Sequence, residues 1–166
     1  GYATAYYNRG AAYAFKRDHD RAIADFDQAV KLKPQYPQAF YDRALAYGAK
    51  GDNDRAIADL DQTIKLDGKN ALAYYNRGIA YQLKGNVDRA AADFGEAIKH
   101  DGRFALAYYQ RGAGYFERGD YNRAIADFTQ AVRGGPRYAV AYYQRGLAFR
   151  KKDDCDRAIA DFSQTV

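Results

Sequence analysis

The chain has 166 residues, of which 48% are hydrophobic and 28% charged, a balance typical of a folded domain and not of a disordered chain. The formal net charge of +5 raises the question of an acidic partner, and the single cysteine excludes an internal disulfide framework and an all-cysteine zinc site. No run approaches the roughly 18 apolar residues that predict a membrane span. We therefore expect a soluble protein, with the cytoplasm favoured.

Two sequence blocks recur along the chain with a period of 34 residues. The first is AYYNRG at 5–10, with copies that begin at residues 39, 73, 107 and 141. The second is DRAIADF at 20–26, with copies that begin at residues 54, 88, 122 and 156. We predict one continuous repeat domain over 1–166, made of five repeats: 3–36, 37–70, 71–104, 105–138 and the incomplete 139–166.

Each repeat contains two helical patterns separated by turn signals. In repeat 1, Tyr6, Gly10 and Tyr13 share one face of a first helix, called helix A, and Ala22 and Phe26 share one face of a second, called helix B. Gly10 would allow the two helices to approach closely while Phe26 fills the space between them. The residues placed to cap helix B are Asp18, Asp52, Asn86, Asp120 and Asp154. The residues expected to end helix B are Pro34, Gly68, Gly102 and Pro136.

A 34-residue helix-turn-helix with this pattern resembles the tetratricopeptide repeat (TPR), and the recurring Arg-Gly and Asp-Arg-Ala-Ile-Ala-Asp-Phe segments are similar to bacterial arrays of that family. The residues that carry the resemblance in repeat 1 are Tyr6, Gly10, Tyr13, Ala22, Phe26, Ala29 and Pro34. The resemblance implies an all-α fold, an α-solenoid wound as a right-handed superhelix of five helix-turn-helix units. It also implies a protein-binding scaffold.

One column departs from the family pattern, because arginine stands where such repeats commonly carry leucine. Its members are Arg9, Arg43, Arg77, Arg111 and Arg145. A repeated aspartate, Asp25 in repeat 1, lies sixteen residues after each of these arginines and four residues after a second one, Arg21. Because the Arg-to-Asp order at i, i+4 is the weaker orientation in a helix, we predict that the first arginine crosses between the helices to the aspartate. The alternative is an anion-binding ladder of arginines.

In repeats of this family, the free face of helix A lines the concave side of the superhelix, and we expect a peptide to bind there. The predicted peptide-binding residues are Tyr7, Asn8, Tyr41, Asp42, Leu45, Tyr75, Asn76, Ile79, Tyr109, Gln110, Tyr143 and Gln144. Amide side chains can pair with a peptide backbone, and tyrosines supply rigid contact area. Since few charges line this face, we expect a largely uncharged, extended segment. The alternative is that the tyrosines only pack each helix A against the next.

Side chains suited to catalysis are scarce. The chain has one serine, Ser163, one cysteine, Cys155, and two histidines, His19 and His100. We place His19 on a surface turn and His100 at a helix C-terminus, where an imidazolium complements the helix dipole. Cys155 shares a variable packing column with His19, Asn53, Val87 and Tyr121. We predict a protein that is not an enzyme, without catalytic residues, a metal site or a cofactor.

Other functions remain open as alternatives. The chain could be a regulatory or targeting segment of a larger enzyme. An anion- or nucleic-acid-binding solenoid is less favoured, because the positive excess is spread over the repeats. A clamp for acidic chaperone tails is disfavoured, because with Asn76 as its middle member the positions that need basic residues hold Tyr41, Leu45, Leu106 and Gln110. The expected partner is a protein or an extended peptide, with no membrane.

The two ends of the sequence raise a further expectation. The chain has no methionine, even at position 1, which suggests a processed product or a piece of a longer protein. Gly1 and Tyr2 stand where a preceding repeat would end, and Val166 falls inside the last helix B. We expect exposed apolar surface at both ends, and either end-to-end self-association or further repeats in the parent protein.

Overall fold

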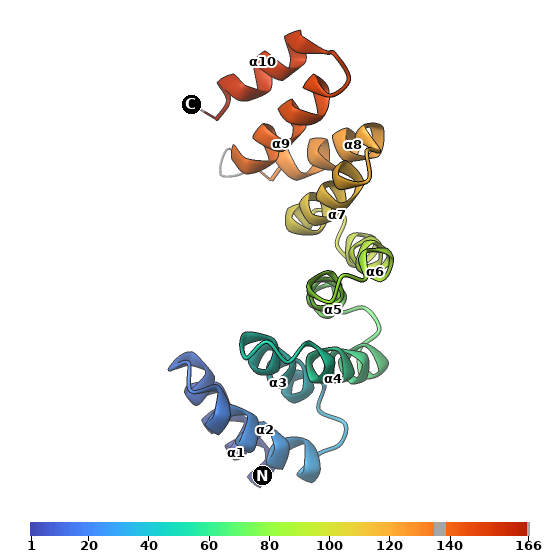
Figure 1. Ribbon diagram of the computed structural model, residues 1–166. Coiled ribbons are helices and arrows are strands. Elements are labelled where there is room, and N and C mark those ends of the chain that lie inside the picture. Colours follow the sequence, from blue (N-terminus) through green and yellow to red (C-terminus); the bar gives the residue numbers. More distant parts are fainter. Residues whose placement is uncertain (135–138, 166) are drawn as a thin grey trace. The chain divides into compact units, whose positions relative to one another are not determined.

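The structure is a computed structural model that describes residues 1–134 and 139–165, and every regular element in those residues is an α-helix (Figure 1). In chain order, the helices are α1 (Tyr2–Phe15), α2 (His19–Leu32), α3 (Pro37–Ala49), α4 (Asn53–Leu66), α5 (Ala71–Leu83), α6 (Val87–His100), α7 (Ala105–Glu117), α8 (Tyr121–Val132), α9 (Ala139–Arg150) and α10 (Cys155–Ser163). This confirms the predicted all-α class and the alternation of A and B helices. Helices α2, α4 and α6 each end two positions before the expected breaker, and Pro136 lies outside the described residues.

The chain divides into two compact units, an N-terminal unit, Gly1–Ala90, and a C-terminal unit, Ala91–Val166, with the boundary inside α6. In the N-terminal unit, α1 packs on α2 and α3 packs on α4, while α2 contacts α3 and α4 contacts α5. In the C-terminal unit, α7 packs on α8 and α9 on α10, while α8 contacts α9. Each unit is therefore a stack of helical hairpins, which is the arrangement of a solenoid.

The turn between helix A and helix B ends in a side-chain cap, as the sequence predicts. The backbone N–H of Arg21 donates to Asp18 Oδ1 at 3.2 Å, and the same bond recurs at Asp52, Asn86, Asp120 and Asp154. The residue before the cap has a positive φ, and it is glycine in three repeats: Gly51, Gly85 and Gly119. Arg17 and Asp153 adopt the same conformation in the first and last repeats. The turn is thus fixed locally, within each hairpin.

Close contact between a small residue on helix A and a large one on helix B forms the centre of each hairpin. A Cβ added to Gly10 would lie 2.9 Å from Phe26 Cδ1, and one added to Gly112 would lie 3.0 Å from Phe128 Cε1. Both phenylalanines are completely buried. Repeat 2 has a different pair in these positions, with Ala44 in place of glycine on helix A and Leu60 in place of phenylalanine on helix B. The extra methyl on one helix is matched by a smaller side chain on the other.

The pairing of Ala44 with Leu60 predicts a non-additive pair of substitutions. Leu60→Phe alone should destabilise the protein by about 1–3 kcal/mol, since the larger ring would meet the Ala44 methyl in a well-packed core. Ala44→Gly alone should cost about 1 kcal/mol of helix propensity. The double variant, with the Gly and Phe of the other repeats, should be more stable than the sum of the two effects predicts. Urea unfolding of the four proteins measures the coupling, and a Leu60→Phe penalty that persists in the Ala44→Gly background would contradict it.

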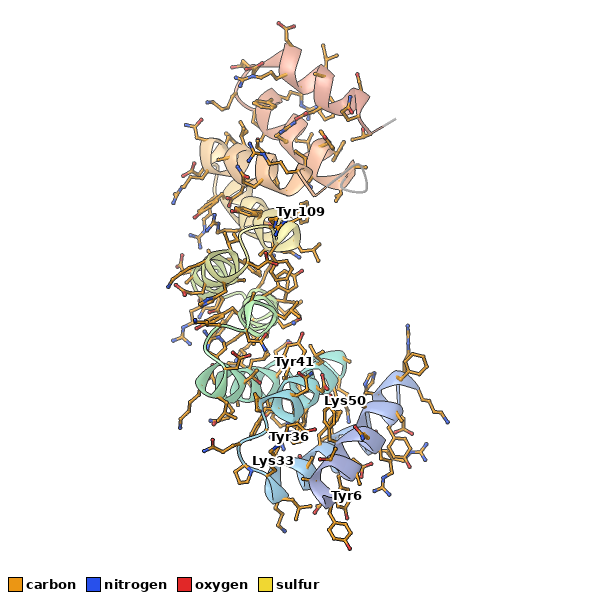
Figure 2. All side chains as sticks on the ribbon, turned by 180° about the vertical axis from the view of Figure 1, so that it is seen from behind. Tyr6, Lys33, Tyr36, Tyr41, Lys50 and Tyr109 are labelled. Atoms are coloured by element: carbon orange, nitrogen blue, oxygen red, sulfur yellow. The ribbon has the colours of Figure 1, made fainter. Side chains whose placement is uncertain are left out.

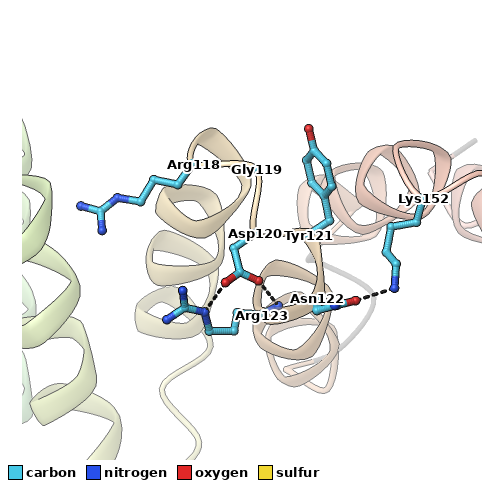
Figure 3. A pocket seen from close by; sticks show the side chains of 7 residues that line it. All are labelled: Arg118, Gly119, Asp120, Tyr121, Asn122, Arg123 and Lys152. Atoms are coloured by element: carbon cyan, nitrogen blue, oxygen red, sulfur yellow. Dashed lines mark hydrogen bonds and ion pairs between the residues drawn. The ribbon is translucent and has the colours of Figure 1, made fainter.

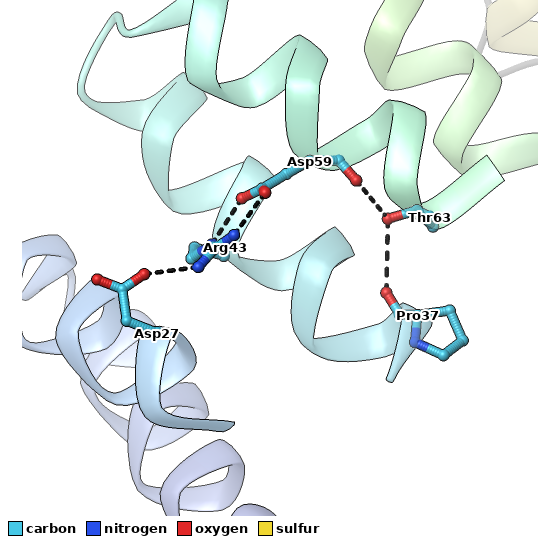
Figure 4. Close-up of polar contacts among 5 residues, drawn as sticks. All are labelled: Asp27, Pro37, Arg43, Asp59 and Thr63. Carbon is cyan, nitrogen blue, oxygen red and sulfur yellow. Dashed lines mark hydrogen bonds and ion pairs between the residues drawn. The ribbon is translucent and has the colours of Figure 1, made fainter. Parts of the chain in front are cut away.

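The arginine column crosses between the two helices in repeats 1, 2, 4 and 5, as the sequence predicts. Arg43 donates from Nε to Asp59 Oδ2 at 2.7 Å and from Nη2 to Asp59 Oδ1 at 2.6 Å (Figure 4). The same two-bond pairing joins Arg9 to Asp25, Arg111 to Asp127 and Arg145 to Asp161. These aspartates are buried, with 5–6% of their surface exposed. The alternative partner, Arg21, instead binds the cap residue Asp18.

The same arginines also tie consecutive hairpins together. Arg43 Nη1 donates to Asp27 Oδ1 of repeat 1 at 2.6 Å, so that one guanidinium connects α2, α3 and α4 (Figure 4). Arg77 binds Asp61 of the preceding repeat at 2.7 Å, and Arg145 binds Thr129 of the preceding repeat at 3.1 Å. Burial by itself lowers the pKa of Arg43, but the hydrogen bonds that it donates to Asp59 and Asp27, together with the attraction of their charges, outweigh burial and raise the pKa. The guanidinium is therefore a permanently charged link within and between hairpins.

Removal of this link should cost more in repeat 2 than in repeat 1. Arg43→Ala should lower the free energy of unfolding by about 3 kcal/mol or more, because it leaves the buried Asp59 carboxylate without its cation. Arg9→Ala is the matched control and should cost less, since 61% of the Arg9 side chain is exposed and its ion pair is confined to one hairpin. Denaturant unfolding of both variants gives the comparison. Equal losses would contradict the role of Arg43 as a link between hairpins.

The caps predict a defined pH dependence. Hydrogen bonds from the Arg123 backbone and side chain lower the pKa of Asp120 below its ordinary value near 4. The charged cap therefore contributes stability that is complete above about pH 4 and is lost as the pH falls through the lowered folded-state pKa. Asp120→Asn, which places at this position the residue type of Asn86, should be less stable than the parent at neutral pH. The difference should shrink in unfolding measurements below about pH 4, and a gap that is constant with pH would contradict the prediction.

Candidate functional site

The predicted peptide-binding residues all lie on A helices, but they fall into two groups. Eight of them, from Tyr7 to Ile79, belong to α1, α3 and α5 of the N-terminal unit. The other four, Tyr109, Gln110, Tyr143 and Gln144, belong to α7 and α9 of the C-terminal unit. Because α1 contacts α3 and α3 contacts α5, the first group forms one surface, which we call the A-helix face of the N-terminal unit.

Two tyrosines of this face connect successive A helices. The hydroxyl of Tyr7 on α1 donates to Asp42 Oδ2 on α3 at 2.8 Å. One repeat later, Asn76 Nδ2 on α5 donates to the hydroxyl of Tyr41 at 2.9 Å and also to the Leu72 carbonyl. Burial raises the pKa of both tyrosines, and the hydrogen bond with Asp42 raises that of Tyr7 further. These two tyrosines therefore pack and bond one helix A to the next, as the second interpretation of the sequence expects.

Asp42 is held by neutral groups. In addition to the Tyr7 hydroxyl, it accepts a hydrogen bond at Oδ1 from Gln38 Nε2 at 3.2 Å. The ring of Tyr36 lies 5.0 Å from that of Tyr7. The ammonium nitrogen of Lys33 lies over this same Tyr36 ring, 4.7 Å from its centroid (Figure 2). The carboxylate is half-buried beside these rings.

Two equivalent pockets open on the A-helix face, one repeat apart. The first pocket, about 390 Å³, is lined by Ala11, Ala14, Phe15, His19, Phe26, Asp42, Leu45 and Ala46. The second pocket, about 200 Å³, is lined by Ala44, Leu45, Gly48, Asn53, Ala56, Leu60, Asn76, Ile79, Ala80 and Leu83. Corresponding residues are 34 positions apart, for example Asp42 and Asn76. Leu45 borders both pockets, so the two form a row.

The composition of the two pockets differs at the polar positions. The first pocket has an acid and an imidazole, Asp42 and His19, where the second has two amides, Asn76 and Asn53. Most of the remaining wall is aliphatic or aromatic in both pockets. His19 is thus the first residue of α2 and a pocket wall, so the expectation of a surface turn is wrong. Its Nδ1 is shielded from solvent and has no hydrogen-bond partner among the described residues.

The sequence analysis missed the contribution of helix B to the pockets. His19 and Asn53 begin α2 and α4, and Phe15 and Leu83 end α1 and α5. The signal that could have found His19 and Asn53 is the variable column that starts helix B, since variation at a fixed repeat position is typical of a surface that differs between repeats.

In repeat 4 of the C-terminal unit, aromatic rings occupy the positions at which repeats 1 and 2 have open pockets. Phe116 and Tyr121 lie where Ala14 and His19 lie in repeat 1, and their ring centroids are 5.4 Å apart, edge to face. Tyr109 packs on Phe128 at 5.9 Å. The amides Gln110 and Gln144 of this unit are half-buried.

A third depression, about 440 Å³, lies at the turns of repeats 4 and 5 and is polar (Figure 3). It is lined by Arg118, Gly119, Asp120, Tyr121, Asn122, Arg123 and Lys152. Two of its cationic groups are engaged locally, because Arg123 binds Asp120 and Lys152 donates to the side-chain Oδ1 of Asn122 (Figure 3). The equivalent lysines, Lys50 and Lys84, pair with Asp20 and Asp54. The depression is therefore part of the bonding between hairpins.

Other kinds of site have little support in the described residues. Within 1–134 and 139–165, no group of three or more His, Cys, Asp or Glu side chains is arranged to hold a metal ion. Cys155 is exposed, and the Ser163 hydroxyl donates to the Ile159 carbonyl within its own helix. None of the helices in this part of the chain is long and apolar enough to cross a membrane.

Comparison with known proteins identifies the repeats. Models of the tetratricopeptide repeat match residues 3–36, 41–111 and 78–129, and a further TPR repeat model matches residues 114–153. No curated protein matches the sequence.

Solved structures of repeat proteins are similar over nearly the whole chain. A crystal structure of MamA is 28% identical over 98% of this chain and 89% of that chain, with a TM-score of 0.89. MamA from Desulfovibrio magneticus RS-1 is 21% identical over 99% of this chain and 93% of that chain, also with a TM-score of 0.89. YrrB, described as a TPR protein with an unusual peptide-binding site, is 19% identical over 96% of this chain and 82% of that chain, with a TM-score of 0.81. The chain belongs to the tetratricopeptide repeat family.

Proposed function

We propose that this chain is a non-catalytic protein-interaction scaffold that binds an extended peptide or protein segment on the A-helix face of the N-terminal unit. Membership of the TPR family supports the scaffold role, because such repeats generally bind proteins or peptides and are generally not catalytic. The observation that carries the location is the row of two equivalent pockets that share Leu45. An extended chain projects side chains at regular intervals, so it suits pockets that repeat with the hairpin.

The polar groups beside the pockets suit a peptide backbone, with one change from the sequence expectation. Asn76 uses its amide nitrogen within the protein, in bonds to the Tyr41 hydroxyl and the Leu72 carbonyl. The role left for this residue is that of an acceptor, through Oδ1, for a backbone N–H of the ligand. Leu45, with 41% of its surface exposed, supplies apolar contact to side chains in both pockets.

The arginine columns argue against an anion-binding solenoid. In each repeat, the arginine that stands where the family commonly has leucine pairs with a carboxylate of the protein. The partners are Asp25, Asp59, Asp61, Asp127 and Asp161. A phosphate would have to displace a buried, doubly hydrogen-bonded aspartate to reach most of these guanidinium groups. No observation favours this alternative over the peptide groove.

Substitution of Leu45 tests the proposed groove. A library of random 12-residue peptides displayed on phage is selected on the parent protein, and the enriched peptides are synthesised and titrated. Leu45→Gln should weaken their binding by about tenfold or more, because apolar contact to both pockets is lost. Leu32→Gln is the matched control, since Leu32 is 53% exposed on α2 and lines neither pocket. Selection of no peptide, or equal affinity for the parent and Leu45→Gln, would refute the groove.

A further inference from the structure

The first pocket contains a carboxylate for which the protein supplies no cation. In the described residues, the hydrogen-bond partners of Asp42 are the Tyr7 hydroxyl and the Gln38 amide, and no Lys or Arg side chain lies within 4.0 Å of it. The neighbouring lysine, Lys33, is engaged with the ring of Tyr36. In this respect Asp42 differs from the buried aspartates of helix B in repeats 1, 2, 4 and 5, each of which pairs with an arginine of its own hairpin.

The acid is also specific to one repeat. Residues at the equivalent position of the other repeats are amides: Asn8, Asn76, Gln110 and Gln144. An amide can also bond to the tyrosine of the preceding repeat, with donor and acceptor reversed, because Asn76 Nδ2 donates to the Tyr41 hydroxyl. The connection between A helices therefore does not require a charge. The connection between A helices therefore does not explain why this position carries a negative charge in repeat 2.

The surroundings of Asp42 fit a long side chain with a charged tip. Ala11, Phe15 and Leu45 give the first pocket an apolar wall, against which the methylene groups of a lysine or arginine can pack. Asp42 then accepts a charge-assisted hydrogen bond from the ammonium or guanidinium group. His19 lines the same pocket, and its Nδ1 is shielded from solvent with no hydrogen-bond partner among the described residues.

The second pocket sets a different requirement. No ionisable side chain lines it, and its wall contains Leu60, Ile79 and Leu83. It is therefore suited to an aliphatic side chain, for which burial of apolar surface is the main source of binding energy. Because Leu45 separates the two pockets, one extended segment can occupy both.

We propose that the bound segment carries a lysine or arginine side chain that enters the first pocket and pairs with Asp42, and an aliphatic side chain that enters the second pocket beside Asn76. This inference rests on the proposed groove and adds the chemistry of its ligand. It also changes the sequence expectation of an uncharged partner at one position. The partner is an extended segment of another protein with a basic and an aliphatic residue in close succession.

The test compares selected peptides on matched variants. Asp42→Asn keeps an acceptor for Tyr7 and removes the charge, while Asp20→Asn removes one charge at an exposed position outside both pockets. Peptides selected on the parent from the phage library should be enriched in lysine or arginine. Their affinity should fall by about tenfold or more on Asp42→Asn, as expected for loss of a charge-assisted hydrogen bond, and stay unchanged on Asp20→Asn.

A substitution in the peptide gives an independent measurement that needs no variant protein. Replacement of its lysine by norleucine, which has a similar length and no charge, should weaken binding to the parent as much as Asp42→Asn does. It should have little further effect on Asp42→Asn, because both changes remove the same interaction. Circular dichroism of both protein variants verifies that they fold like the parent.

The outcomes separate the two proposals. Enriched peptides that lack a basic residue but lose affinity on Leu45→Gln would leave the groove in place and overturn the cation. Equal effects of the norleucine peptide on the parent and on Asp42→Asn would also overturn it. Binding that neither Leu45→Gln nor Asp42→Asn alters would overturn both proposals, as would selection of no peptide. A parent dimer that forms without peptide and separates on Asp42→Asn would assign the groove to a second copy and overturn the peptide partner.

Discussion

The stacking of the hairpins depends on a buried ion pair that serves two hairpins at once. A guanidinium held by two hydrogen bonds to a carboxylate of its own hairpin keeps one nitrogen directed at the preceding hairpin, where Arg43 meets Asp27 and Arg145 meets Thr129. Leucine at this position would pack equally well against either neighbour, whereas the planar guanidinium fixes the distance and orientation of three helices together. The cost is desolvation of both charges, which the hairpin offsets by satisfying both carboxylate oxygens.

Because the arginine ion pairs hold the hairpins together, other side chains of the A helices are available for contacts between A helices and for pocket walls. Tyr7 and Tyr41 lie between successive A helices and bond to Asp42 and Asn76. The pockets form where these tyrosines leave space, next to small residues such as Ala14 and Gly48. In repeat 4, the larger Phe116 occupies that position and packs on Tyr121. In repeats 1, 2 and 4, the residue at this one position thus distinguishes an open pocket from an aromatic contact.

The period of the sequence predicted most of the fold, because each hairpin is built from local signals. Caps such as Asp18, the small residue at Gly10 and the crossing of Arg9 to Asp25 all follow from spacing within one repeat. The pockets could not be predicted in this way, because they arise from differences between repeats and from residues of three helices. His19 illustrates the limit: as an isolated histidine near a turn it resembled a surface residue, and only the packing of α2 against α1 and α3 makes it a pocket wall.

The paired exchange of Gly and Phe for Ala and Leu in repeat 2 has a consequence for how such arrays can recombine. The two partners stand sixteen residues apart, on opposite sides of the turn between helices A and B. Recombination at the junction between repeats moves both partners together and preserves their fit. A crossover at the turn would join the Ala44 helix to a phenylalanine helix, or a glycine helix to Leu60, and create a clash in one product and a void in the other. The boundary between hairpins, and not the turn within them, is therefore the junction at which sequences of this array can be exchanged while the fit between these two positions is kept.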